Sequence, residues 1–168
     1  NSYDFNPVPE GVNAALIKGG QANLWSEQLF TYRHLQYMLY PRAWAVAEDL
    51  WSANENKNWN NFIGRVENHF ERSDVAEIKY ARSMYDPIFK FSKTAKREIE
   101  VDMAAEVGNI SFHYSFDHSN PDQFYPIASS RLIVPKDAVE MRVISYRGKK
   151  PMGQMIRFPI SDMLKRIK

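Results

Sequence analysis

The spacing of the hydrophobic residues changes along this chain of 168 residues, and that change constrains its fold. From Leu35 to Leu50 the apolar residues recur three or four positions apart. This spacing places them on one face of a helix, which Pro41 should bend after its first turn. From Ile110 to Phe116 the spacing is two, which is typical of a half-buried strand. We therefore expect an α+β chain, helical in its first half and stranded in its second.

Two further helical stretches are expected before the strands begin. The first is indicated by three apolar residues at four-residue spacing: Phe62, Val66 and Phe70. The second should begin near Asp74, because Asp74 and Glu77 have the spacing of a capping box, and Pro87 should end it.

The second half is expected to form a small antiparallel β-sandwich. Besides the strand at 110–116, the alternation predicts short strands at 99–103, 131–134, 139–146 and 152–159. Residues 117–122 have the composition of a turn, and residues 147–151 that of a hairpin loop. Residues 90–97 are polar and basic without periodicity. We place a boundary there and expect two domains, residues 1–93 and residues 94–168.

One short motif in the first half carries chemistry. If the stretch that ends at Glu27 is a strand, Trp25 and Glu27 lie on the same face at its carboxyl end. An indole ring can cover the apolar face of a pyranose, while a carboxylate accepts charge-assisted hydrogen bonds from two neighbouring hydroxyls. Considered without context, the same pair is also compatible with an ordinary core tryptophan beside a solvated glutamate.

The context of this motif is longer than three residues. It lies in the run GGQANLWSE at residues 19–27, and the following helix reads YMLYPRAWAVAEDLWS at residues 37–52. Together these runs resemble the last βα unit of the β-N-acetylhexosaminidases of glycoside hydrolase family 20. The upstream run YDFNPVP at residues 3–9 is similar to the loop before the final barrel strand in bacterial members.

The resemblance implies roles for two residues. The tryptophan matching Trp25 stacks on the terminal N-acetylhexosamine, and the glutamate matching Glu27 hydrogen-bonds the outer hydroxyls of that sugar. Family members remove terminal β-linked N-acetylglucosamine or N-acetylgalactosamine with retention, and the substrate's own acetamido oxygen attacks C1. An Asp orients the acetamido group, and the Glu directly after it protonates the leaving oxygen. No Asp-Glu dipeptide occurs in this sequence, so we assign no catalytic residue and expect this chain to be inactive alone.

The length of the chain limits how much of such an enzyme it can contain. A complete (β/α)₈ barrel needs about 250 residues. We therefore expect residues 1–93 to hold the last βα unit and the closing helices of the barrel. The run FHYSFDHSNP at residues 112–121, with YPI at 125–127, is similar to the fibronectin-like C-terminal domain of many bacterial hexosaminidases, although His118 replaces the usual Gly. The alternative function is a non-catalytic carbohydrate-binding or structural module, based on the sandwich alone.

Other aromatic and charged residues in the first half are interpreted as structural. Five aromatic residues are candidates either for a glycan cleft or for packing, and packing is favoured: Tyr3, Tyr40, Trp44, Trp51 and Trp59. We interpret Arg42 and Glu48 as structural charges near the barrel seam.

No cofactor and no metal site are expected. The chain has no cysteine, which removes thiolate nucleophiles and cysteine-based zinc sites. Three histidines lack partners at metal-ligand spacing and are expected at the surface or in turns: His69, His113 and His118. Asp117, Ser119 and Asp122 suggest a calcium loop, but Pro121 and the missing central glycine break that pattern.

The expected partners are glycans that end in N-acetylhexosamine. Residues 131–168 hold ten Lys/Arg and three Asp/Glu, but these charges alternate with apolar residues as on solvated strands, so no nucleic acid is expected. No segment approaches the ~18 apolar residues of a membrane span. Self-association is expected, because a strand without neighbours and the 35–50 helix face both need cover. The family resemblance implies a periplasmic or extracellular protein.

Overall fold

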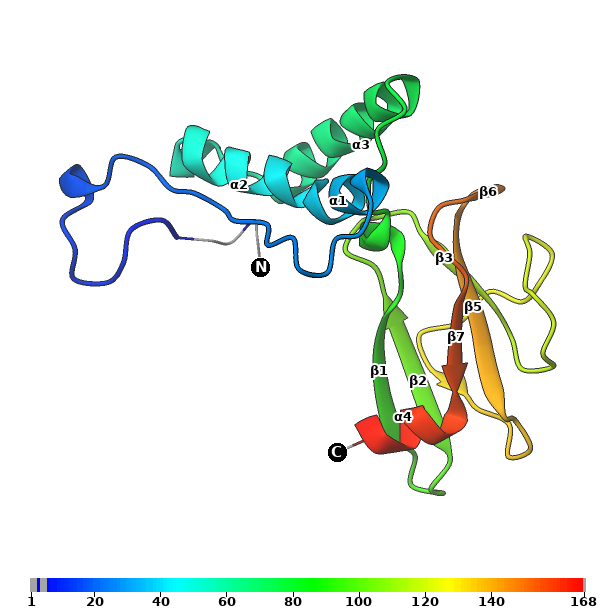
Figure 1. The fold of residues 1–168 in the computed structure, drawn as a ribbon. Coiled ribbons are helices and arrows are strands. Elements are labelled where there is room, and N and C mark those ends of the chain that lie inside the picture. Colours follow the sequence, from blue (N-terminus) through cyan, green and yellow to red (C-terminus); the bar gives the residue numbers. More distant parts are fainter. Residues whose placement is uncertain (1–2, 4–5, 168) are drawn as a thin grey trace. The chain divides into compact units, whose positions relative to one another are not determined.

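The computed structural model describes residue 3 and residues 6–167, and its contacts divide the chain into two compact units, Asn1–Ala81 and Arg82–Lys168 (Figure 1). The expected mixture of helices and antiparallel strands is confirmed, and the described residues form no barrel. The division falls earlier than the boundary expected at residues 90–97. None of the helices in the described part of the chain has the length and hydropathy that crossing a membrane requires.

Unit 1 is built on three helices, α1 (Tyr32–Leu39), α2 (Arg42–Trp51) and α3 (Trp59–Val75), with short 3₁₀ turns η1 (Ala14–Leu16) and η2 (Asn54–Asn56). The helix expected over residues 35–50 is thus two helices. Pro41 separates them because proline has no backbone N–H and its ring clashes with the preceding turn. Side-chain caps begin two of the helices: Thr31 Oγ1 accepts from His34 N at 3.1 Å, and Asn58 Oδ1 accepts from Asn61 N at 2.9 Å.

Helix α3 confirms the expected apolar face. Phe62, Val66 and Phe70 are all buried. The Phe70 ring stacks on that of Tyr80, with centroids 4.1 Å apart and planes 9° from parallel. Tyr80 lies beyond the end of α3, so the chain must turn back after the helix for these rings to meet.

The prediction of a second helix that begins near Asp74 is wrong. Asp74 lies inside α3, and the helix ends one residue later at Val75. Glu77 adopts the left-handed conformation with φ of 54°. Ile78 N donates to Ser73 O at 2.8 Å and Glu77 N donates to Asp74 O at 3.3 Å, which is the Schellman arrangement that ends a helix. The spacing of Asp74 and Glu77 therefore marks a helix end rather than a beginning.

The strand expected to end at Glu27 is also absent. Residues 17–26 have no regular secondary structure, and Glu27 begins a turn. A strand exists only through hydrogen bonds to a neighbour. No ladder among the described residues includes this segment, so its alternating pattern has no partner here.

Unit 2 contains two antiparallel sheets. One has the order β1 (Ile88–Lys93), β2 (Ile99–Ala104), β4 (Leu132–Ile133). In the other, β5 (Glu140–Arg147) pairs with β3 (Ser111–Ser115), β6 (Lys150–Pro151) and β7 (Ile156–Pro159). The strands predicted near residues 99, 110, 131 and 139 are confirmed, whereas only the end of the segment 152–159 is a strand.

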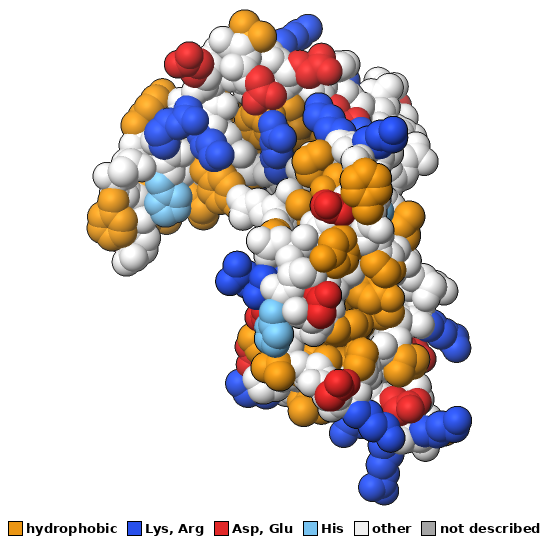
Figure 2. All heavy atoms as spheres, turned by 90° about the vertical axis from the view of Figure 1, so that its right-hand side faces the viewer, with side chains coloured by type: hydrophobic (Ala, Val, Ile, Leu, Met, Phe, Trp, Pro, Cys, Tyr) orange, Lys and Arg blue, Asp and Glu red, His pale blue; other side chains and the backbone are white. Residues whose placement is uncertain are grey.

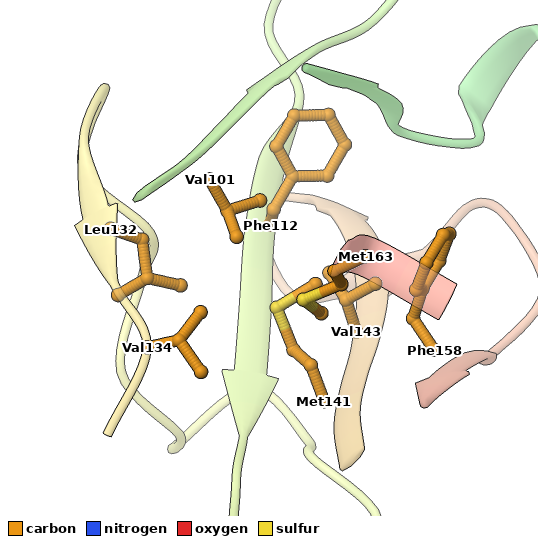
Figure 3. Packing of buried hydrophobic residues seen from close by; sticks show 8 residues of the cluster. All are labelled: Val101, Phe112, Leu132, Val134, Met141, Val143, Phe158 and Met163. Atoms are coloured by element: carbon orange, nitrogen blue, oxygen red, sulfur yellow. The ribbon is translucent and has the colours of Figure 1, made fainter. Parts of the chain in front are cut away.

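Side chains from both sheets share one core (Figure 3). The buried residues of this cluster are Val101, Phe112, Leu132, Val134, Met141, Val143, Phe158 and Met163. Met163 comes from α4 (Ile160–Arg166), a helix that the sequence did not indicate. It is completely buried, so the closing helix completes the core of this unit.

Strand β1 accounts for the shift of the domain boundary. In this strand Phe89 and Phe91 alternate with polar residues, and both rings contact Phe158, with centroids 5.2 and 4.9 Å away. The strand holds three large apolar residues, but only Phe91 lies within residues 90–97, and the lysines there gave that segment the composition of a linker. Because β1 pairs with β2 over its whole length, residues 88–93 belong to unit 2.

Candidate functional site

Trp25 and Glu27 lie on the irregular segment between η1 and α1. The Trp25 side chain is 72% exposed and Glu27 is exposed as well, so neither belongs to the core of unit 1. Leu29 N donates to Ser26 O at 3.0 Å, which places Glu27 inside a turn. The structure therefore positions both side chains at the surface but does not give them the strand alternation that would align them.

This segment is attached to the helices near both of its ends. Gly20 lies against α2: a Cβ atom there would be 2.9 Å from Leu50 Cδ2. At the other end, Thr31 caps α1. The motif thus lies on a loop that is held against α2 at Gly20 and joined to α1 at Thr31. Its indole ring and its carboxylate are exposed to solvent.

Four of the five candidate aromatic residues pack inside unit 1, as expected. Tyr3 contacts the rings of Trp59 and Phe62 at 5.0 and 4.9 Å. Tyr40 and Trp44 lie 5.0 Å apart, and Trp44 also contacts His69 at 5.0 Å. Trp51 differs, because it is 89% exposed at the end of α2.

The charges of α2 are structural. Arg65 Nη2 donates to Glu48 Oε1 at 2.6 Å and Arg65 Nη1 donates to Glu48 Oε2 at 3.0 Å. Lys57 pairs with Asp49 at 3.1 Å. The hydrogen bonds from Arg65 hold the pKa of Glu48 below its usual value. Arg42 donates to the carbonyl oxygen of Met38 at 2.9 Å and so caps the end of α1. The interpretation of Arg42 and Glu48 as structural charges is therefore confirmed.

The histidines of unit 2 have different environments. The surface position expected for His113 is wrong: it is 4% exposed, its Nδ1 lies 2.8 Å from Tyr125 O, and its ring contacts Tyr146. Its position on a strand that is buried on both faces explains the difference. His118 has φ of 64° and lies in a bend, as expected, with Nδ1 3.0 Å from Glu140 Oε1.

The acidic residues of the 117–122 turn are engaged by the turn itself. Asp117 Oδ1 accepts from the backbone N–H of Ser119 at 3.0 Å and from its hydroxyl. Asp122 Oδ1 accepts from Phe124 N at 2.8 Å. In the described part of the chain, no group of three or more His, Asp or Glu side chains is arranged to hold a metal ion.

Residues 1–54 match the family model described as glycosyl hydrolase family 20, catalytic domain. Both Trp25 and Glu27 lie within this stretch. These residues are therefore similar to part of a family 20 catalytic domain. The resemblance seen in the sequence is confirmed.

Similar proteins agree with this assignment. A beta-hexosaminidase of Porphyromonas gingivalis is 38% identical over 81 residues, which are 46% of this chain and 10% of that protein. A beta-N-acetylhexosaminidase of Cellulomonas fimi is 39% identical over 72 residues, 41% of this chain and 14% of the relative. A beta-hexosaminidase of Akkermansia muciniphila is 40% identical over 70 residues, 40% of this chain and 14% of the relative. The chain thus spans less than a sixth of the length of each of these relatives.

Proposed function

We propose that this chain is part of a bacterial retaining exo-β-N-acetylhexosaminidase and supplies residues that bind the terminal sugar. The observation that carries the proposal is the family 20 match over residues 1–54, which includes the Trp-x-Glu motif. Unit 1 would then be the end of the catalytic barrel, and unit 2 a fibronectin-like sandwich. The substrates would be glycans that end in β-linked N-acetylglucosamine or N-acetylgalactosamine.

The surface position of Trp25 and Glu27 is compatible with a binding role. If residues 19–27 pair with neighbouring strands in the whole enzyme, side chains two positions apart share a face. Trp25 and Glu27 would then point together toward the sugar, and Leu24 and Ser26 toward the other side. The indole would exclude water from the apolar face of the ring while the carboxylate accepts hydrogen bonds from its hydroxyls.

The bond-breaking chemistry would come from another part of the enzyme. The acetamido oxygen of the substrate attacks C1, the bond from C1 to the leaving oxygen breaks, and a glutamic acid delivers a proton to that oxygen. Water then opens the oxazolinium-like intermediate with net retention. This chain has no Asp-Glu pair to orient and protonate, so its contribution is to hold the sugar in place. We infer that the 168-residue chain alone does not turn over an aryl N-acetylglucosaminide.

The test is substitution in the whole enzyme that contains this chain. Trp25→Ala should lower kcat/KM by about fivefold or more, because ring stacking contributes on the order of 1 kcal/mol beyond area burial. Glu27→Gln keeps the shape but removes the charge, and should also lower kcat/KM. Glu55→Gln, an exposed residue of η2, is the matched control and should leave kcat/KM unchanged. Unchanged kcat/KM in both motif variants would remove the motif from the sugar subsite.

The place of the protein in the cell follows from the same proposal. The family resemblance implies a periplasmic or extracellular protein, so we propose that the enzyme acts in the periplasm or outside the cell. Activity toward an aryl N-acetylglucosaminide in the periplasmic or culture fraction is the expected result. Activity confined to the cytoplasmic fraction would contradict it.

A further inference from the structure

Unit 2 carries a surface groove of about 410 Å³ at the end of β3. Its walls come from three parts of the chain: β3 and the residues after it, the loop at 125–126, and the turn at 135–138. The lining residues are Tyr114, Ser115, Phe116, Asp117, Tyr125, Pro126, Pro135, Asp137 and Ala138. The volume is within the range of small-molecule binding sites.

The aromatic wall of the groove is held in place by the core. Tyr114 and Phe116 lie two residues apart, and their rings meet edge to face with centroids 5.5 Å apart. Both are only partly buried: one side packs against the core cluster and the other is left to line the groove. The opposite wall is tied to β3, because Tyr114 N donates to Pro126 O at 3.2 Å. Tyr114 is therefore presented on strand β3, and Phe116 directly after its end, with both rings packed against the core cluster.

The polar part of the groove is acidic. Asp117 and Asp137 are both exposed and approach from separate loops. Hydrogen bonds from Ser119 keep the pKa of Asp117 below its usual value, so this carboxylate is ionised at neutral pH. Among the described residues that line the groove there is no lysine, arginine or histidine. Such a lining repels anions and offers acceptors to hydroxyl and amide N–H donors.

The surface beside the groove is also apolar. Phe124 and Ile127 flank the lining residues Tyr125 and Pro126 in sequence, and both are exposed, Phe124 by 84%. Val139, which follows Ala138, is exposed as well. Hydrophobic side chains with acidic and basic ones around them can be seen in the lower half of Figure 2. Contiguous exposed apolar surface of this kind is typical of a binding site.

We propose that this groove binds a hexosamine-containing glycan, with a sugar ring against Tyr114, Phe116 and Tyr125 and its donors on Asp117 and Asp137. Aromatic rings with carboxylates at their edge match a pyranose, which has an apolar face and hydroxyl groups around its rim. The choice of a hexosamine glycan rests on the proposed function. The inference that the groove binds a sugar ring rests on its lining residues alone. The site would bind the glycan through residues of unit 2 rather than through Trp25 and Glu27.

The test is calorimetric titration of the 168-residue chain with a β-1,4-linked N-acetylglucosamine trimer. Millimolar binding is expected. Asp137→Asn should weaken it by about fivefold, because a hydrogen bond to a charged acceptor becomes one to a neutral acceptor. Tyr125→Ala should weaken it at least as much. Asp122→Asn is the matched control, because Asp122 is an exposed aspartate of the neighbouring turn and does not line the groove.

Several outcomes would overturn the proposal. These are no heat with the trimer, binding that is equal in all variants, or binding of a basic proline-rich peptide in place of the trimer. Circular dichroism of each variant identifies any loss of fold, and the conservative Asp137→Asn change keeps the test valid if Tyr125→Ala does not fold. Tryptophan fluorescence recorded during the titration reports on unit 1 alone, because all four tryptophans lie between residues 25 and 59. Binding at the groove is instead measured by the heat and by its decrease in the groove variants. Failure of the groove is therefore distinguishable from failure of the Trp25 subsite, which is measured by kcat/KM.

Discussion

At the scale of single residues, Gly153 is the most crowded of the described glycines of unit 2. Its N–H donates to Ser145 Oγ at 2.9 Å, and the next residue, Gln154, donates to Asp86 Oδ1 at 3.3 Å. A Cβ atom on Gly153 would be 2.5 Å from both of these side-chain oxygens. Ser145 is completely buried, so it has little room to move.

We predict that Gly153→Ala destabilises the chain by about 1–3 kcal/mol, because the added methyl forces a shift of Asp86 or Ser145. Urea unfolding measures the change. Gly108→Ala is the matched control, because a Cβ there meets nothing within 4 Å and its φ is not in the left-handed region. Equal stabilities of the two variants would show that the contact at Gly153 relaxes without cost.

Glu48 predicts a pH dependence of stability. The hydrogen bonds and charge of Arg65 lower the pKa of Glu48 in the folded chain from the ordinary value of 4.5. A depressed carboxyl pKa stabilises the fold above the unfolded-state value, and the contribution is lost as the pH falls through the folded-state value. The stability difference between wild type and Glu48→Gln should therefore be full at neutral pH and shrink below about pH 4.5. Urea unfolding from pH 7 to pH 3 measures it, and a difference that is constant with pH would contradict the assignment.

At the scale of elements, the end of α3 is the clearest case of structure held against local preference. Glu77 adopts φ of 54°, a conformation that glycine accepts readily and other residues do not. The conformation persists because it lets Ile78 and Lys79 return toward α1, where Lys79 N donates to Gln36 Oε1 at 3.1 Å. Arg33 of α1 also donates to the carbonyl oxygen of Glu77. Contacts with another helix thus stabilise the turn.

We predict that Glu77→Gly stabilises the chain by about 0.5–1 kcal/mol, because it removes the left-handed strain and keeps every backbone hydrogen bond. Glu71→Gly is the matched control. The same change at an exposed position inside α3 should destabilise by about 1 kcal/mol. Thermal unfolding of both variants shows whether each change raises or lowers the stability. A less stable Glu77→Gly variant would mean that the Glu77 side chain stabilises the fold by more than its backbone conformation destabilises it.

At the scale of the whole molecule, the described residues up to the start of α1 expose several large apolar side chains. The large exposed side chains in this region are Val12, Leu16, Leu24, Trp25, Phe30 and Tyr32. Surface of this kind is normally covered by a partner. In the proposed enzyme, the preceding part of the catalytic barrel would cover it.

We predict that the isolated chain self-associates, because a second copy in solution can cover this exposed apolar surface. Light scattering should give a mass that rises with concentration. Removal of residues 1–30 should reduce this association, and a protease should cut the same segment first. A full-length chain that stays monomeric at all concentrations would contradict the prediction.

Part of the site was predictable from the sequence, and part was not. The resemblance of the run around Trp25 and Glu27 to family 20 needs no coordinates, because it rests on the order of the residues in the sequence. The sequence did not show that the segment would remain irregular, since strand formation depends on neighbours. The groove of unit 2 was not predictable either, because its walls at Tyr114, Tyr125 and Asp137 are brought together only by the packing of β3 and two loops.

The sequence alone predicts the elements in which the spacing of hydrophobic residues repeats over enough positions to be recognised. The face of α3 with Phe62, Val66 and Phe70 and the alternating strands β3 and β5 follow from the spacing of side chains along a helix or a strand. Only the tertiary structure decided β1, the burial of His113 and the end of α3. Each of these depends on groups far away in the chain: Phe158 covers Phe89 and Phe91, the Tyr125 carbonyl faces His113, and Gln36 holds the turn after Glu77. The spacing of hydrophobic residues shows which face of an element can be buried. The contacts with residues elsewhere in the chain decide whether the element forms and what covers that face.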